Sequence, residues 1–339
     1  MRRFLFSSLF LALFVSVSSC SDVSTPTQEV VVYTALDRNF SEVIFEAFEK
    51  KTGIKVRASY DTESTKSVGL ANRIRRESKT PRCDVFWNNE IVNTLLLKKE
   101  GHLQTSSPKE AANYPATFRD PEGYWYGFAA RARVLIVNTE LVPEARRPTK
   151  ISDLIDPQWK GKVGIAKPLF GTTASHVAAL FALHGPEKAK EFLTNVRANE
   201  AQIHGGNKGC ARAVADGHNA FAMTDTDDAI IEKEAGKPVA IVYPDAGDGE
   251  DGTLLIPNTL AVLKGAPNPG NALKLIEYLL SPEVEKALAN GPSAQIPLNK
   301  NSAPNTKLPK VSRPMKIDFE KAAEQFAPAR EYVEKVFLK

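Results

Sequence analysis

Residues 221–230 read FAMTDTDDAI, and this stretch decides the fold because an apolar run passes directly into hydrogen-bonding side chains. The run Phe221 to Met223 predicts a short buried strand. The segment 229–235 predicts a helix, and Gly236 is the residue expected to end it. Side-chain oxygens at a strand-to-helix junction lie at the mouth of an α/β sheet, where such folds bind ligands. The stretch therefore predicts a binding site as well as a fold class.

Three side chains of this stretch are candidates for that site: Thr224, Thr226 and Asp227. Thr226 or Asp227 is expected to cap the helix, because a short oxygen-bearing side chain can accept from the free amides of a first turn. A helix cap with no role in binding is the simpler alternative. The choice between ligand binding and helix capping depends on whether other parts of the chain place polar groups at the same sheet edge.

Upstream of this stretch, strands alternate with helices from residue 29 onward. Short apolar or alternating runs predict strands over 29–34, 54–60 and 84–87. Helices are predicted from Phe40 to Gly53, where the glycine ends the helix, and over 65–79 and 91–100; the first and the last have one apolar face. This alternating order is typical of a parallel, right-handed, doubly wound α/β sheet.

A second α/β unit begins with a predicted strand at 163–166 and contains the stretch described above. Two strands, 124–128 and 134–138, are expected between the two units, separated by Ala129–Arg133. A helix over 319–336 is expected to end the chain.

Length and composition agree with two α/β units. The chain has 339 residues, which is more than one hydrophobic core normally serves, so two domains are expected. Charged residues make up 25% and hydrophobic residues 42%, as in ordinary soluble globular proteins. The net charge of +4 is small for this length and argues against dedicated nucleic-acid binding.

Residues 1–20 predict a secretory signal, with a positive start, an apolar run and small residues before Cys20. The run is too short for a stable membrane span. This arrangement resembles the lipobox of bacterial lipoproteins, which implies cleavage before Cys20 and lipid attachment to its sulfur. Residues 21–28 are polar and predict a tether between a membrane anchor and the fold. An ordinary secretory signal with an incidental cysteine is the alternative.

Several short motifs occur between Glu29 and about Asn301, and their order and spacing together are specific although each alone is weak. The motifs are Val32 to Thr34 (VYT), Phe45 to Glu49 (FEAFE), Thr52 to Val56 (TGIKV), Asp84 to Trp87 (DVFW), Arg131 to Val134 (RARV) and Trp159 to Gly164 (WKGKVG). In these motifs the chain resembles bacterial extracellular solute-binding proteins of ABC importers. Within that group it is most similar to the ferric-iron-binding periplasmic proteins.

The resemblance implies two α/β lobes, each a doubly wound sheet, that close over a ligand in the cleft between them. Residues 29–130 with 259–300 would form lobe 1, residues 131–258 lobe 2, and residues 301–339 a helical tail packed on the lobes. We expect a monomer that captures a small solute and delivers it to an inner-membrane ABC permease. No catalysis, no cofactor and no nucleic-acid partner are expected.

Cys83 and Cys210 have neither a CxxC partner nor a histidine at metal-binding spacing, so a zinc site is not expected. A disulfide between them is feasible in an exported protein. It would tie the two implied lobes together and restrain their closing. We therefore expect two free thiols.

The positions that hold iron in ferric members of the family carry other residues here. The paired tyrosines of those members fall on Thr226 and Asp227. Their histidine falls on Asp37, and their glutamate falls on Asn89, with Glu90 beside it. None of those ligand types is retained. The carboxylates of Asp37, Glu90 and Asp227 could still hold a hard cation such as ferric ion through oxygen.

The positions that hold an accompanying anion are better kept. Thr172 and Thr173 stand at the start of a predicted helix, Asn207 stands at the start of another, and Thr224 belongs to the same set. Free amides and hydroxyls at helix N-termini suit phosphate-like or carboxylate oxygens. Arg131 would add positive charge from the junction of the lobes. Helix capping alone is the alternative role for the two threonines.

Two ligands fit this set of residues. The first is ferric iron with an anion, in which carboxylates replace the tyrosine phenolates. The second is an aminoalkyl phosphonate or another phosphate-like solute, in which the amides bind the phosphonate and Asp227 or Asp37 binds the ammonium group. The family resemblance makes ferric iron the expected cargo.

A metal-dependent hydrolase is the alternative from another class, because Asp225, Asp227 and Asp228 could be read as a metal cluster. Hydrolysis would also need further ligands and a general base with a pKa near 7. His204 is the only histidine near a predicted strand end. The sequence has no Ser-His-Asp signature and no GxxxxGK[ST] loop, so catalysis is not expected.

Overall fold

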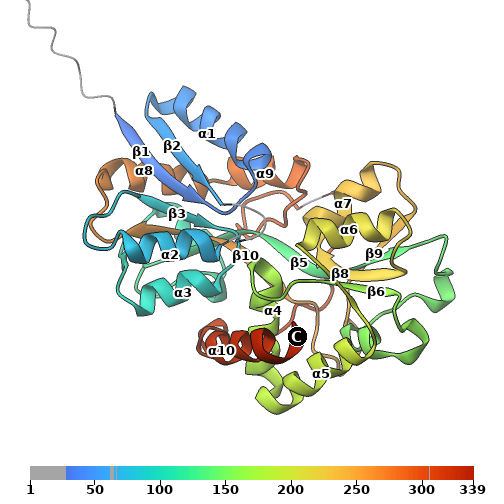
Figure 1. The fold of residues 1–339 in the computed structure, drawn as a ribbon. Helices are drawn as coiled ribbons and strands as arrows, with labels where there is room; N and C mark the ends of the chain where they lie inside the picture. Colours follow the sequence, from blue (N-terminus) through green and yellow to red (C-terminus); the bar gives the residue numbers. More distant parts are fainter. Residues whose placement is uncertain (1–27, 62–64, 66, 305) are drawn as a thin grey trace, which may run out of the picture.

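One strand, β5 (Tyr126–Asn138), runs through both halves of the molecule and joins them (Figure 1). Its first half pairs with β10 (Leu255–Leu263), and its second half pairs with β8 (Phe221–Asp225) and β9 (Val239–Val242). The expectation of two strands separated by Ala129–Arg133 was wrong. Every residue of β5 is buried, and both of its arginines meet carboxylates, so the strand continues through this polar segment.

The structure is a computed structural model that describes residues 28–61, 65, 67–304 and 306–339. The predicted signal with Cys20, and the tether up to residue 27, lie outside the described residues. None of the helices in the described part of the chain has the length and apolar character that a bilayer crossing requires.

Lobe 1 is built on a sheet with the strand order β2-β1-β3-β10-β5. Strand β1 (Glu29–Thr34) is parallel to β2 (Lys55–Tyr60) and β3 (Val85–Asn88), as the alternating pattern predicts. Strands β10 and β5 are antiparallel to their neighbours, and the short β4 (Leu103–Gln104) pairs with β10. The sheet is therefore mixed rather than uniformly parallel.

Helices cover both faces of this sheet (Figure 1). Helix α1 ends as its sequence predicts, because Gly53 adopts a φ of 73° and donates its N–H to the Glu49 carbonyl at 2.8 Å. The helices of the lobe are α1 (Arg38–Thr52), α2 (Val68–Arg76), α3 (Val92–Lys99), α8 (Pro269–Leu279) and α9 (Pro282–Asn290). Their apolar sides form two cores, one with α1, α8 and α9 and one with α2 and α3.

Lobe 2 is built on the second half of β5, which continues in the order β5-β8-β6-β7, with β9 also paired to β5. Strand β6 (Val163–Ala166) is parallel to β7 (Gln202–His204) and to β8. The helices of this lobe are α4 (Gly171–His184), α5 (Pro186–Ala198), α6 (Asn207–Ala215) and α7 (Thr226–Glu234). Three of them, α4, α6 and α7, begin near the carboxyl ends of β6, β7 and β8, which is where α/β sheets place ligands.

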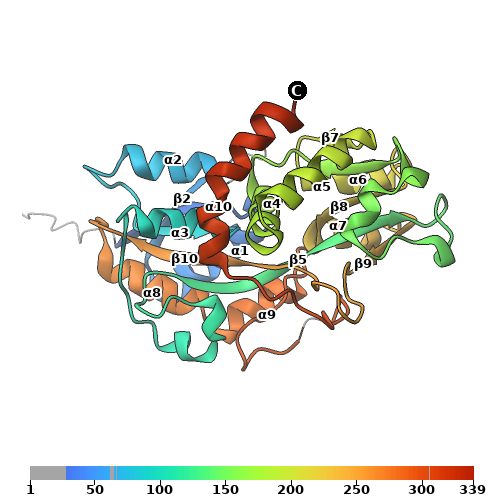
Figure 2. The same cartoon turned by 90° about the horizontal axis from the view of Figure 1, so that it is seen from below.

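The last helix, α10 (Phe319–Tyr332), lies across the molecule against both α3 and α4 (Figure 2). Phe319 and Phe326 join the core that contains α3, and Ala329 joins the core of lobe 2 together with Val333 and Phe337 of the π-helical turn that follows α10. The C-terminal helix therefore contributes to a core on each side of the molecule, and its position agrees with the helix expected over 319–336.

Cys83 lies just before β3 and Cys210 lies in α6. Both thiols are buried and neither forms a disulfide. Burial raises the pKa of both thiols, so they remain protonated near neutral pH.

Candidate functional site

The junction between β8 and α7 differs in one respect from the sequence expectation. The N-cap residue of α7 is Asp225, and the expectation that Thr226 or Asp227 would cap the helix was wrong. The Asp225 side chain makes no capping hydrogen bond. It pairs instead with Arg133. A buried carboxylate without a cationic partner costs more free energy than a helix N-terminus without a capping side chain.

Arg133 and Asp225 are the centre of a buried network behind the junction. Arg133 Nη1 donates to Asp225 Oδ1 at 2.7 Å, and Nη2 donates to Thr173 Oγ1 at 3.2 Å. The other oxygen, Asp225 Oδ2, accepts from Thr172 Oγ1 at 2.6 Å and from Asn207 Nδ2 at 2.9 Å. Burial raises the pKa of the Asp225 carboxyl, but the charges of Arg133 and Arg131 outweigh burial and hold that pKa below its usual range. The side chains of Thr172, Thr173 and Asn207 thus serve this ion pair, where the sequence predicted that they would face an anion.

Arg131 lies two residues before Arg133 on β5 and is also buried. Its Nη1 is 3.7 Å from Asp225 Oδ2 and 3.6 Å from Asp227 Oδ2. Its Nη2 donates to the backbone carbonyl of Asn89 in lobe 1. Burial lowers the pKa of Arg131, but Asp227 and the other carboxylates outweigh it and raise that pKa. Arg131 therefore remains charged and links the two lobes at the base of the site.

A pocket opens above Arg131, between the lobes. Lobe 1 lines it with Asp37, at the start of α1, and with Asn89, after β3. Lobe 2 contributes the N-terminal ends of α4, α6 and α7. The lining residues from lobe 2 and β5 are Arg131, Ala166, Lys167, Phe170, Gly171, Thr172, Thr173, Gly205, Gly206, Asn207, Asp225, Asp227 and Asp228. Polar groups from both lobes thus meet in one place.

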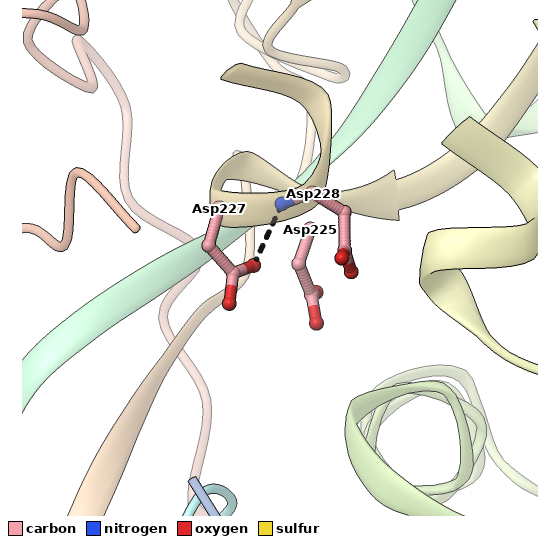
Figure 3. Close-up of side chains that lie close together, drawn as sticks. All are labelled: Asp225, Asp227 and Asp228. Atoms are coloured by element: carbon pink, nitrogen blue, oxygen red, sulfur yellow. Dashed lines mark hydrogen bonds between the residues drawn. The ribbon is translucent and has the colours of Figure 1, made fainter. Parts of the chain in front are cut away.

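Three carboxylates gather on the lobe 2 side of the pocket. Asp225, Asp227 and Asp228 each place an oxygen within 4.8 Å of the other two, and Figure 3 shows the three carboxylates on the same side of the junction. Asp227 also accepts from the backbone N–H of Asp228 at 3.1 Å. Oxygen atoms at this separation could hold one hard cation.

Asn89 lines the pocket from lobe 1. Its side chain is buried, and its Oδ1 has no hydrogen-bond partner among the described residues. A buried polar atom without a partner is costly unless a water or a ligand satisfies it. Since Asn89 lines the pocket, its oxygen is available to a bound ligand.

Glu90 is placed differently from the sequence expectation. Its side chain is fully buried and does not line the pocket. Its oxygens accept from the backbone N–H groups of Val92 and Asn93 at the start of α3, and from Ser175 Oγ on α4. These bonds occupy the carboxylate, so Glu90 is a structural acceptor rather than a cation ligand in this arrangement.

Thr224 and Thr226 are also fully buried and absent from the pocket lining. Thr224 Oγ1 donates to the carbonyl of Asn207, and Thr226 Oγ1 accepts from the N–H of Ala132 on β5. Both side chains hold the junction against its neighbours. Neither reaches the pocket.

The sequence indicated Asp225 and Asp228 only under the hydrolase alternative and did not single out Lys167, although all three line the pocket. It also missed Arg133, which lies behind the pocket and pairs with Asp225. Asp225 and Asp228 belong to residues 221–230, so the density of aspartates in that stretch was the signal that could have identified them. Arg133 had a signal too, because an arginine in a strand predicted to be buried needs an acidic partner. Lys167 is exposed and carries no signal of its own.

Two lobes that share crossing strands, with a polar pocket between them, define a two-lobed solute-binding protein. The comparison with known families agrees. Residues 92–325 match the model of the bacterial extracellular solute-binding proteins, and the chain belongs to this family. Proteins of this family bind substrates for transport and are not enzymes.

The names of similar proteins refer either to iron or to a phosphonate. "Iron uptake protein A2" of Synechocystis is 28% identical over 301 residues, which cover 86% of this chain and 84% of that protein. Iron-bound HitA of Pseudomonas aeruginosa has a TM-score of 0.81 and 27% identity, covering 90% of this chain and 99% of that one. A putative 2-aminoethylphosphonate-binding periplasmic protein of Salmonella typhimurium is 25% identical, covering 74% of this chain and 71% of that protein.

Proposed function

We propose that this chain is the solute-binding component of an ABC importer and captures ferric iron together with an anion. The observation that carries the proposal is the group of three carboxylates, Asp225, Asp227 and Asp228, in a pocket that lies between the lobes. Relatives named for iron uptake and ferric-iron binding support the choice of cargo.

Carboxylates would form the cation side of the site. Asp227 and Asp228 from lobe 2 and Asp37 from lobe 1 line the same pocket and offer the hard oxygen ligands that ferric ion prefers. The spare oxygen of Asn89 adds a neutral ligand from lobe 1. Asp225 contributes less, because Arg133 already pairs with it at 2.7 Å. Glu90 is left out, because its oxygens are occupied by α3 and α4.

Backbone amides would form the anion side. Helices α4, α6 and α7 all begin at the pocket, and the first amides of a helix have no partner within it. Arg131 adds a positive charge between the carboxylates and lobe 1. The hydroxyls of Thr172 and Thr173 are engaged with Arg133 and Asp225, so these residues would act through their backbone N–H groups.

Substitution of Asp227 tests the proposal. Removing one member of a desolvated charge pair costs about 2–5 kcal/mol, so Asp227→Ala should weaken ferric citrate binding by about thirtyfold or more. Asp227→Tyr places a phenolate where ferric members of the family carry one, and it should preserve or strengthen iron binding. Isothermal titration of the wild type and both variants measures these changes.

Asp216→Ala is the matched control, because Asp216 is an exposed carboxylate whose partner is Lys237 on the surface. It should bind ferric citrate as the wild type does. Equal binding by the wild type, Asp227→Ala and Asp227→Tyr would mean that Asp227 has no part in the site and would sink the proposal.

An aminoalkyl phosphonate is the second candidate cargo. It is favoured by one observation: Asp227 lines the pocket beside the N-terminal ends of α4, α6 and α7, and a carboxylate beside helix N-termini suits an ammonium group joined to a phosphonate. The phosphonate-binding relative supports it. Under this alternative, Asp227→Tyr should abolish binding of 2-aminoethylphosphonate, whereas iron binding should be undetectable in the wild type.

We also propose that the protein is exported, cleaved before Cys20 and held at the membrane by a lipid, as a monomer that delivers its cargo to a permease. The support is the run of small residues before Cys20 and the polar residues after it. Cys20→Ala should therefore move the protein from the membrane fraction to the soluble fraction of the cell. Membrane association that survives this substitution would exclude the anchor.

A further inference from the structure

Besides the bond from Arg131 to the Asn89 carbonyl, a side-chain hydrogen bond joins the two lobes just behind the pocket. Ser175 Oγ, on α4 of lobe 2, donates to Glu90 Oε2 of lobe 1 at 2.7 Å. Glu90 is fully buried and Ser175 is nearly so. The same carboxylate accepts from Val92 N at 2.6 Å and from Asn93 N at 3.0 Å, so it is fixed to the start of α3. The bond therefore connects the first turn of α3 to the first turns of α4.

The bond lies beside an apolar core, and the other side-chain donors to Glu90 are Asn88 and Asn93 of lobe 1. Ala174 and Ala178 of α4 share a core with Ile91 and Leu95 at α3. Helix α10 packs against both α3 and α4 and adds Phe326 to the same core. Water is excluded there, so a hydrogen bond to the Glu90 carboxylate is stronger than it would be at the surface. The two lobes thus meet in a packed contact with one charged hydrogen bond inside it.

Both ends of the bond adjoin the pocket walls. Glu90 directly follows Asn89, the lobe 1 residue that lines the pocket with a spare oxygen. Ser175 lies one turn along α4 from Gly171 and Thr172, which line the pocket from lobe 2. A shift between Glu90 and Ser175 would move these two walls relative to each other.

We infer that Ser175 and Glu90 are positioning residues of the binding site, which set the spacing of its two walls without touching the ligand. Loss of the Ser175 hydroxyl leaves a buried carboxylate with one donor fewer and lets the lobes settle farther apart. The closed arrangement then becomes less populated, and the apparent affinity falls with that population. The affinity part of this inference rests on the proposed function, and the spacing of the lobes does not.

The test is Ser175→Ala, compared with Ser293→Ala. Ser293 is equally buried, but its hydroxyl donates to the Leu288 carbonyl inside lobe 1. Loss of a hydrogen bond to a charged group is expected to raise the dissociation constant for ferric citrate about tenfold or more in Ser175→Ala. Ser293→Ala should leave it unchanged. Ser175→Thr keeps the hydroxyl and should restore most of the affinity.

The spacing of the lobes is measured without any ligand. Spin labels at Ala47→Cys on α1 and Lys233→Cys on α7 report the distance across the pocket in protein that carries Cys20→Ala, because both positions are exposed and the thiols of Cys83 and Cys210 are buried. Double electron–electron resonance should show a longer mean distance, or a broader distribution of distances, in Ser175→Ala than in Ser293→Ala. Adding ferric citrate should shorten the distance in both proteins.

A double-mutant cycle with Glu90→Gln separates the bond from other effects of each change. The Ser175→Ala and Glu90→Gln effects on lobe distance should fail to add, because Ser175→Ala removes the bond and Glu90→Gln removes the negative charge that strengthens it. If Ser175→Ala lowers the melting temperature but changes neither the lobe distance nor the affinity, Ser175 is only structural and the inference is wrong. If the wild type binds neither ferric citrate nor 2-aminoethylphosphonate, the proposed function fails, while the lobe distance still decides this inference.

Discussion

Arg133 on β5 and Asp225 on β8 stand directly opposite each other in the antiparallel register, and their side chains form an ion pair at 2.7 Å. Side chains at opposite positions of neighbouring strands leave the sheet on the same face. The register therefore brings together two buried charges that are 92 residues apart in the sequence. This pair fixes the start of α7 and holds Thr172 and Asn207, which begin two further helices of the site.

Arg133→Met should destabilise the protein by about 3–5 kcal/mol, because it leaves the Asp225 carboxylate buried without its closest cation. Guanidinium unfolding at pH 7 measures the loss. Adding Asp225→Asn to this variant should recover part of the stability, because the unpaired charge is then removed. Arg330→Met is the control, since the pair between Arg330 and Glu334 is partly exposed and should contribute less than about 1 kcal/mol.

Protonation of His176 should destabilise the protein in acid. Burial, together with the charge of Arg133, lowers the pKa of this histidine to about 3, whereas the unfolded chain titrates near 6.5. The unfolded state thus binds one more proton between about pH 3 and pH 6.5, so stability falls as the pH falls through that window, by up to about 5 kcal/mol. In His176→Gln, unfolding curves at pH 7 and pH 4 should differ less than in the wild type. An unchanged difference would contradict the prediction.

Phe326→Ala should destabilise the protein by about 3 kcal/mol, because it opens a cavity where α10 meets the core of α3 and α4. Phe326→Leu fills most of that space and should cost less. Val336→Ala in the same C-terminal segment is the control, because Val336 is 46% exposed. Similar unfolding midpoints for Phe326→Ala and Val336→Ala would mean that the C-terminal helix is not part of the folded core.

Much of the architecture followed from local sequence. Apolar runs of four to six residues gave β1, β3 and β6, and Gly53 ended α1, because strand and helix periods and glycine turns depend on near neighbours in the chain. The stretch 221–230 likewise marked a strand, a helix and a polar junction in the right order. The N-cap residue of α7 did not follow from the sequence, because several neighbouring side chains with oxygen atoms could occupy that position.

Only the tertiary structure decided what each polar side chain does. Asp225 is paired with Arg133, Glu90 is occupied by α3 and Ser175, and Asp227 and Asn89 line the pocket, although all four are short polar residues beside strand ends. The continuity of β5 was also decided there, since its arginines stay buried only because carboxylates from β8 and α7 approach them. The sequence by itself determined most of the strands and helices and where polar groups collect, but not the continuity of β5. Which of those groups neutralise one another was decided by strand register and lobe packing, because burying a charge depends on partners that are distant in the chain.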